Sequence, residues 1–191
     1  MKKTLETLAL ASTLVAGVPA MALTFQSAQT HGGTSVANAA ATGLLAFDID
    51  FRNTAAAVLH YTVAAEDLAA PIGFNAVLRN LSGFAFDGFD ITLSPGSFAS
   101  AGSVTRSFGG STQVTLAGGA ARLAFDTPES FEIEIGDAFG STPGATNWTL
   151  AGLQAGDTLT VSVSAVPEPQ TAAMWLAGLL AMGFISARRS R

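Results

Sequence analysis

Phe47-Asp48-Ile49-Asp50-Phe51 alternates apolar and acidic residues without a break. A period of two places the apolar side chains on one face of a β-strand and the carboxylates on the other. The same alternation recurs at residues 89–93, 131–135 and 159–164. The pattern predicts antiparallel strands that cover a core with one face and meet water with the other.

Shorter strand-like runs lie between these segments, at residues 58–63, 74–81, 103–108, 113–116, 121–125 and 147–150. Turn residues separate them, among them Gly109-Gly110, Gly118-Gly119 and Pro143-Gly144. About ten short strands with turn signals roughly every 8–12 residues indicate an all-β fold, an antiparallel β-sandwich or jelly roll. Only residues 64–70 have even a brief helical pattern.

Residues 1–22 have the composition of a secretory signal peptide. Lys2 and Lys3 precede an apolar run, and the segment closes with Ala20-Met21-Ala22. Small residues at the -3 and -1 positions are what signal peptidase accepts. We therefore expect Sec-type export with cleavage after Ala22.

Residues 171–187 form an uncharged, apolar stretch followed by Arg188, Arg189 and Arg191. At ~1.5 Å per residue a helix here would span about 25 Å, the lower limit for crossing a bilayer. Arginines at its end would stay on the cytoplasmic side and leave the body outside. The sequence thus predicts a precursor anchored in the inner membrane by a transmembrane helix at 171–187.

Pro167, Glu168 and Pro169 stand directly before this stretch, whose centre is Leu-Ala-Gly-Leu-Leu-Ala at 176–181. With the Arg188-Arg189 cluster, this order resembles the PEP-CTERM sorting signal of exopolysaccharide-producing Gram-negative bacteria. The resemblance is limited to residues 166–191. It implies that an exosortase, a membrane transpeptidase-like protease, recognises the tripeptide and delivers the protein to the cell surface or outside. The two prolines fit, because they forbid helix around Glu168 and keep the segment extended.

The body between these ends is acidic and contains no lysine. Residues 23–165 hold 12 acidic side chains and 4 arginines, a net charge of -8. This charge argues against nucleic acid as a partner. The chain has no cysteine, which excludes disulfides, thiolate zinc sites and cysteine nucleophiles. We expect a flexible polar lead-in at 23–42 and the sandwich at 43–165, with no linker before the sorting signal.

Catalytic residues are scarce. His31 lies in the glycine- and serine-rich lead-in, and His60 alternates with apolar neighbours on a predicted strand, so both are expected to be solvated. Paired carboxylates are the one suggestive group: Asp48 with Asp50, Glu132 with Glu134, and Asp87 with Asp90, of which the four aspartates are the calcium candidates. Such pairs could bind calcium or serve a glycosidase, but acids two apart on a strand are also typical of any solvent face.

The aromatic residues favour a core over a sugar-binding platform. Thirteen are phenylalanine, and Trp148 is the one tryptophan ahead of the C-terminal stretch. Sugar platforms prefer Trp and Tyr, whereas Phe at alternating positions packs inside. We expect a non-catalytic structural or adhesive protein of the cell surface, extracellular matrix or biofilm, without a cofactor and with exopolysaccharide as a possible partner. The alternatives are a calcium-assisted carbohydrate-binding module and a secreted hydrolase.

Overall fold

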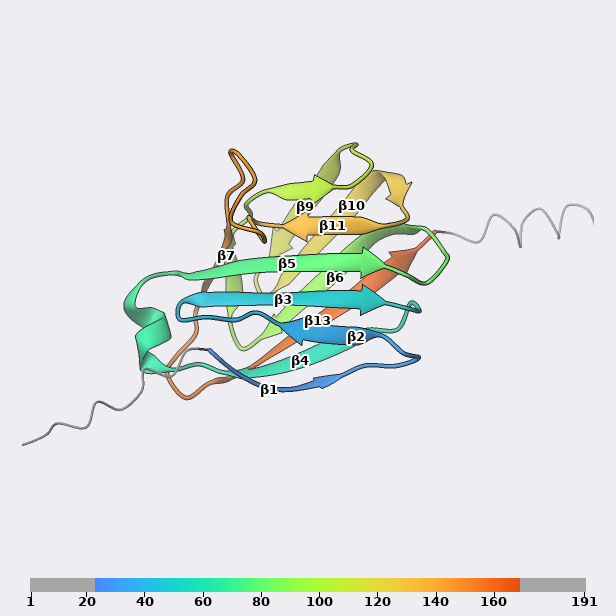
Figure 1. The fold of residues 1–191 in the computed structure, drawn as a ribbon. Coiled ribbons are helices and arrows are strands. Elements are labelled where there is room, and N and C mark those ends of the chain that lie inside the picture. Colours follow the sequence, from blue (N-terminus) through green and yellow to red (C-terminus); the bar gives the residue numbers. More distant parts are fainter. Residues whose placement is uncertain (1–22, 169–191) are drawn as a thin grey trace, which may run out of the picture.

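The structure is a computed structural model that describes residues 23–168, which fold into two β-sheets (Figure 1). The first sheet, sheet A, has the strand order β1-β4-β13-β6-β10-β9. All its pairings are antiparallel. Its strands are β1 (Thr24–Gln29), β4 (Ala57–Thr62), β13 (Thr158–Pro167), β6 (Phe86–Ser94), β10 (Ala120–Glu129) and β9 (Thr112–Ala117).

The second sheet, sheet B, has the order β2-β3-β5-β11-β8. Its members are β2 (Ser35–Asn38), β3 (Leu44–Phe51), β5 (Ile72–Asn80), β11 (Glu132–Ile135) and β8 (Val104–Arg106). β12 (Trp148–Ala151) pairs with the first residues of β5 and with β7 (Ser97–Ser100). A short 3-10 helix, η1 (Ala65–Ala69), joins β4 to β5 and is the brief helix that the sequence predicts.

The all-β prediction is confirmed, since strands make up 58% of the described residues and helix 3%. The four alternating segments lie in β3, β6, β11 and β13, and their apolar residues are buried except Phe131, which precedes β11 and is exposed. One pairing departs from the antiparallel expectation, because β3 runs parallel to β5 over its whole length. Parallel neighbours need a crossover connection, and β4 with η1 supplies it by passing through sheet A.

The two sheets face each other across one core (Figure 1). Phe51 of sheet B contacts Phe86 and Phe89 of sheet A, with ring centroids 6.3 and 5.5 Å apart. Trp148 is fully buried against Phe74 and Phe98, as the sequence predicts. Edge-to-face packing of this kind adds to the stabilisation that area burial already gives.

The prediction of a flexible lead-in at residues 23–42 is wrong. Residues 24–29 form β1, which pairs with β4, and residues 35–38 form β2, which pairs with β3. Both are edge strands whose side chains are mostly exposed, so they contain few large apolar residues. Phe25 packs edge-on against Tyr61, and Val36 is partly buried against the core.

The predicted signal peptide, the predicted span at 171–187 and the arginine cluster Arg188, Arg189 and Arg191 lie outside the described residues. Within residues 23–168, no helix is both long and apolar enough to cross a membrane.

Candidate functional site

The last strand of the body runs without interruption into the C-terminal tripeptide. β13 occupies the middle of sheet A between β4 and β6, and its final registered pair joins Pro167 to Phe86. The backbone N–H of Glu168 then donates to the carbonyl of Ala85 at 3.3 Å. Pro167 and Glu168 are both exposed. The first two residues of the tripeptide are thus an extended, solvent-facing continuation of a core strand.

Proline fits here because the ladder is ending. The register between β13 and β6 shifts between Val166 and Pro167, so the missing N–H of proline falls at an irregularity. The absence of a linker, expected from the sequence, is what the structure shows up to Glu168. Pro169 lies outside the described residues.

A family model described as the PEP-CTERM protein-sorting motif matches residues 165–190. The chain carries a PEP-CTERM sorting signal. This signal implies a precursor that is exported, anchored in the membrane and processed by an exosortase for the cell surface. No curated protein and no solved structure matches the chain, so the PEP-CTERM signal is the part of it that a family identifies.

The predicted carboxylate pair on β3 lies around an arginine. Arg79 of β5 bonds to Asp50 at 3.3 Å, to Asp48 at 3.5 Å and to Glu132 of β11 at 2.6 Å. These contacts follow from register, because Asp50 and Glu132 flank Arg79 on the two neighbouring strands. Burial acts to lower the pKa of Arg79, but the hydrogen bonds that Arg79 donates to Glu132 and Asp50, with the charges of Glu132 and Asp48, outweigh it and raise that pKa.

A pocket of about 200 Å³ opens beside this arginine. Its lining residues are Ser35, Val36, Ala37, Asp48, Asp50 and Arg79. Asp87 and Asp90 lie elsewhere, on β6 of sheet A, and Asp90 contacts Arg122 at 3.8 Å. The four calcium candidates are therefore divided between two sheets. Within residues 23–168 no three acidic or histidine side chains are grouped as a metal ion requires.

Glu134 lies on β11, two residues after the Glu132 that pairs with Arg79, and its surroundings disfavour the charged form of its carboxyl. Its Oε2 is buried with no hydrogen-bond partner among the described residues. Burial, followed by the charges of Glu132 and Asp137, raises the pKa of its carboxyl, while a hydrogen bond from Thr142 lowers it. The folded body therefore holds a proton on Glu134 at a pH at which the unfolded chain has lost it.

Glu134→Gln should make the body more stable at neutral pH. A raised folded-state pKa makes the free energy of unfolding fall as pH rises from the ordinary value through the raised one, and glutamine removes that loss. The gain in urea midpoint should be present at about pH 7 and vanish at about pH 3, where the carboxyl is protonated in both states. Glu66→Gln is the control at an exposed acid. A gain that is equal at both pH values would contradict this account.

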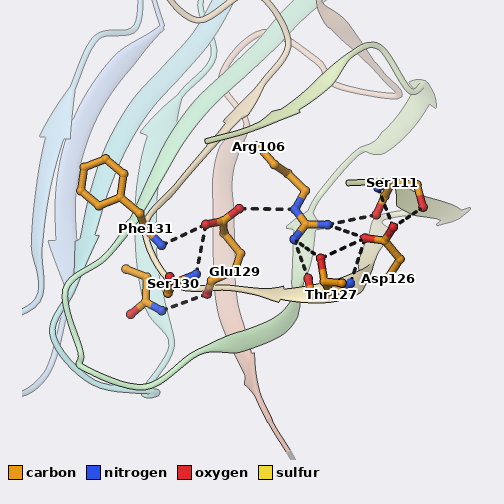
Figure 2. Close-up of polar contacts among 8 residues, drawn as sticks. Arg106, Ser111, Asp126, Thr127, Glu129, Ser130 and Phe131 are labelled. Carbon is orange, nitrogen blue, oxygen red and sulfur yellow. Dashed lines mark hydrogen bonds and ion pairs between the residues drawn. The ribbon is translucent and has the colours of Figure 1, made fainter. Parts of the chain in front are cut away.

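A second arginine forms a polar cluster that joins the two sheets (Figure 2). Arg106 ends β8 in sheet B, and its buried guanidinium bonds to Asp126 at 2.8 Å and to Glu129 at 3.4 Å, both on β10 of sheet A. It also donates to the carbonyls of Ser111 and Thr127, and lies 4.6 Å from the ring centroid of Phe125. We call this arrangement the Arg106 latch.

The carboxylates of the Arg106 latch are themselves held by backbone groups. Glu129 accepts hydrogen bonds from the N–H groups of Ser130 and Phe131 at the corner where β10 leads into β11. The N–H and hydroxyl of Ser111, with Arg106 and the N–H of Thr127, hold the pKa of the Asp126 carboxyl well below its usual range. Asp126 thus keeps its charge as pH falls, until its lowered pKa is reached. A buried network whose polar groups are all hydrogen-bonded in this way makes the fold rigid, so we assign the Arg106 latch a structural role.

The two histidines lie where the sequence places them. His31 is an exposed loop residue, and His60 lies on the outer side of β4 with its Nδ1 3.1 Å from Thr160 Oγ1. Sequence reasoning missed Arg79, Arg106 and Asp67 as organising residues. The available signal was the ratio of charges, since a body with 12 acids and 4 arginines has three carboxylates for each cation, and Arg79 and Arg106 each contact more than one carboxylate.

Proposed function

We propose that the protein is a component of the cell surface whose C-terminal sorting signal is removed during delivery. The signal peptide is cleaved after Ala22, residues 171–187 hold the precursor in the inner membrane, and an exosortase acts at Pro167, Glu168 and Pro169. The β-sandwich body then serves a non-catalytic structural or adhesive role at the cell surface or in the polysaccharide matrix.

The observation that carries the proposal is the sorting motif, fused without a linker to the central strand of the body. The body supports the non-catalytic role. The carboxylates beside Arg79 are ion-paired with it, and Asp126 and Glu129 are ion-paired with Arg106 in the Arg106 latch. Neither arrangement leaves a carboxylate pair free to act as acid and base on a substrate.

The end of the body that leads to the signal suits a position at the membrane. Phe84 is 67% exposed and stands next to Ala85, whose carbonyl receives the Glu168 N–H. Phe131, between β10 and β11, is also exposed, and its carbonyl accepts the backbone N–H of Asn80 at the end of β5. Three residues can span at most about 10 Å, so a span beginning at residue 171 would hold this apolar end against the bilayer surface.

Glu168→Ala or Pro169→Ala should block maturation and leave full-length precursor in the inner membrane of the native host. Each change removes part of the element that the sorting enzyme is proposed to recognise.

Deleting residues 188–191 should instead loosen the orientation of the precursor in the membrane before processing. Fractionation with intact-mass spectrometry measures both results, and Glu66→Ala is the control at an exposed acid of the body. Normal surface delivery of the tripeptide variants would contradict the proposal.

A further inference from the structure

Asp67 is a buried carboxylate at the end of the body opposite the sorting signal. It lies in η1 and is 1% exposed. Its Oδ1 accepts the N–H groups of Leu23 at 3.1 Å and Gly43 at 3.0 Å, and its Oδ2 accepts that of Ala64 at 2.9 Å. Three separate segments of the chain therefore meet on one carboxylate.

This carboxylate has backbone donors but no cation. Among the side chains of residues 23–168, none forms an ion pair with Asp67, whereas Glu129, buried to the same degree, is paired with Arg106. A buried charge is costly unless it is paired as well as hydrogen-bonded. Asp67 therefore needs a positively charged partner that the described side chains do not supply.

Leu23 is the residue that the predicted signal-peptide cleavage would make the first of the mature chain. It is 3% exposed, and its side chain belongs to the hydrophobic core. Its nitrogen is an amide in the precursor. After cleavage the same atom would be an α-amine, protonated and positively charged at neutral pH.

We propose that removal of the signal peptide completes this site by creating a buried ion pair between the Leu23 α-ammonium and the Asp67 carboxylate. The inference rests on the proposed export and on cleavage after Ala22. Signal peptidase hydrolyses the bond between Ala22 and Leu23, so that water supplies the hydroxyl of the new Ala22 carboxylate and a proton to the amine. A second proton from solvent completes the ammonium.

Maturation then exchanges a neutral donor for a charged one at a distance already set by the fold. Charge-assisted hydrogen bonds are roughly twice as strong as neutral ones. The pair fixes the start of β1 to η1 and to the β2–β3 connection at Gly43. The mature body is therefore more stable than the same body with an amide at Leu23.

The sequence offers a direct test, because its only lysines are Lys2 and Lys3. A chain that begins at Leu23 has a single primary amine, the α-amine itself. Mature protein is recovered from the native host, its first residue is established by intact mass, and it is treated with an amine-acetylating reagent in buffer and in urea. Native protein should acquire its single acetyl group at least ~10-fold more slowly than unfolded protein, since a buried amine reacts only when its segment opens.

Two further measurements separate the ion pair from simple burial. Protein acetylated while unfolded and then refolded should melt at a lower temperature than untreated protein that has been unfolded and refolded in parallel. Asp67→Asn should speed the native reaction towards the unfolded rate and remove the difference in melting. Asp90→Asn is the control, since Asp90 lies on β6, contacts Arg122 at 3.8 Å and takes no part in this site.

The outcomes distinguish this inference from the proposed function. A chain that keeps residue 1 and is not exported would overturn both. An exported chain that begins at any residue other than Leu23 would overturn the ion pair alone. Equal acetylation rates in buffer and urea, or equal melting with and without the acetyl group, would also overturn it.

Discussion

Replacing Arg106 by methionine is expected to lower the free energy of unfolding by about 3–5 kcal/mol. The change leaves Glu129, which is 1% exposed, without its counter-charge, and it removes the hydrogen bonds that Arg106 donates to the carbonyls of Ser111 and Thr127. It also removes the ion pairs through which the Arg106 latch joins β8 of sheet B to β10 of sheet A (Figure 2).

Urea unfolding of the mature protein, followed by the fluorescence of Trp148, measures this effect. Arg122→Met is the matched control, because Arg122 is 63% exposed and its contact with Asp90 is long, so the loss should stay within about 1 kcal/mol. Adding Glu129→Gln to Arg106→Met should recover part of the loss by removing the stranded charge. If Arg106→Met and Arg122→Met cost the same, the latch does not stabilise the body.

Trp148→Ala is expected to cost about 3–5 kcal/mol for a different reason, the cavity that it leaves. Trp148 is fully buried, and its ring lies 5.7 Å from that of Phe98 and 6.2 Å from that of Phe74. Its Nε1 also donates to the carbonyl of Ser103 at 3.0 Å, so the substitution removes one of the two hydrogen bonds that this carbonyl accepts, the other coming from the Gly136 N–H.

Circular dichroism in urea measures this variant, since the fluorescent residue is gone. Phe108→Ala is the control for loss of an aromatic ring, because Phe108 is 74% exposed and should change stability by no more than about 0.5 kcal/mol. A small cost at Trp148 would mean that the surrounding rings close over the space, contrary to the dense packing described above.

Alternation made the interior strands predictable. β3, β6, β11 and β13 each bury one apolar row, and this requirement is written in the sequence with period two. The edge strands β1 and β2 were not predictable in the same way, because exposed strands are specified by backbone pairing with β4 and β3 and not by their own side chains. The parallel pairing of β3 with β5 is a property of topology, which alternation does not encode.

The sorting tripeptide was recognisable because its three parts occur in a fixed order along the chain. The Arg106 latch was not, because its members are separated by 5 to 23 residues and meet only when β8 and β10 are brought together. The role of Asp67 could not be predicted from the sequence for a related reason. Its partners are backbone N–H groups, and these have no sequence signature.

The place of β13 in sheet A determines when the body can finish folding. β4 and β6 are joined only through β13, yet residues 158–167 are the last of the described body to be synthesised and exported. Sheet A therefore cannot be completed before β13, the strand that leads into the sorting signal, has been synthesised. Its completion depends on contacts far apart in the chain, which form slowly. A chain that stops before residue 158 lacks both β13 and the sorting signal. Such an incomplete product can neither complete its core nor be sorted.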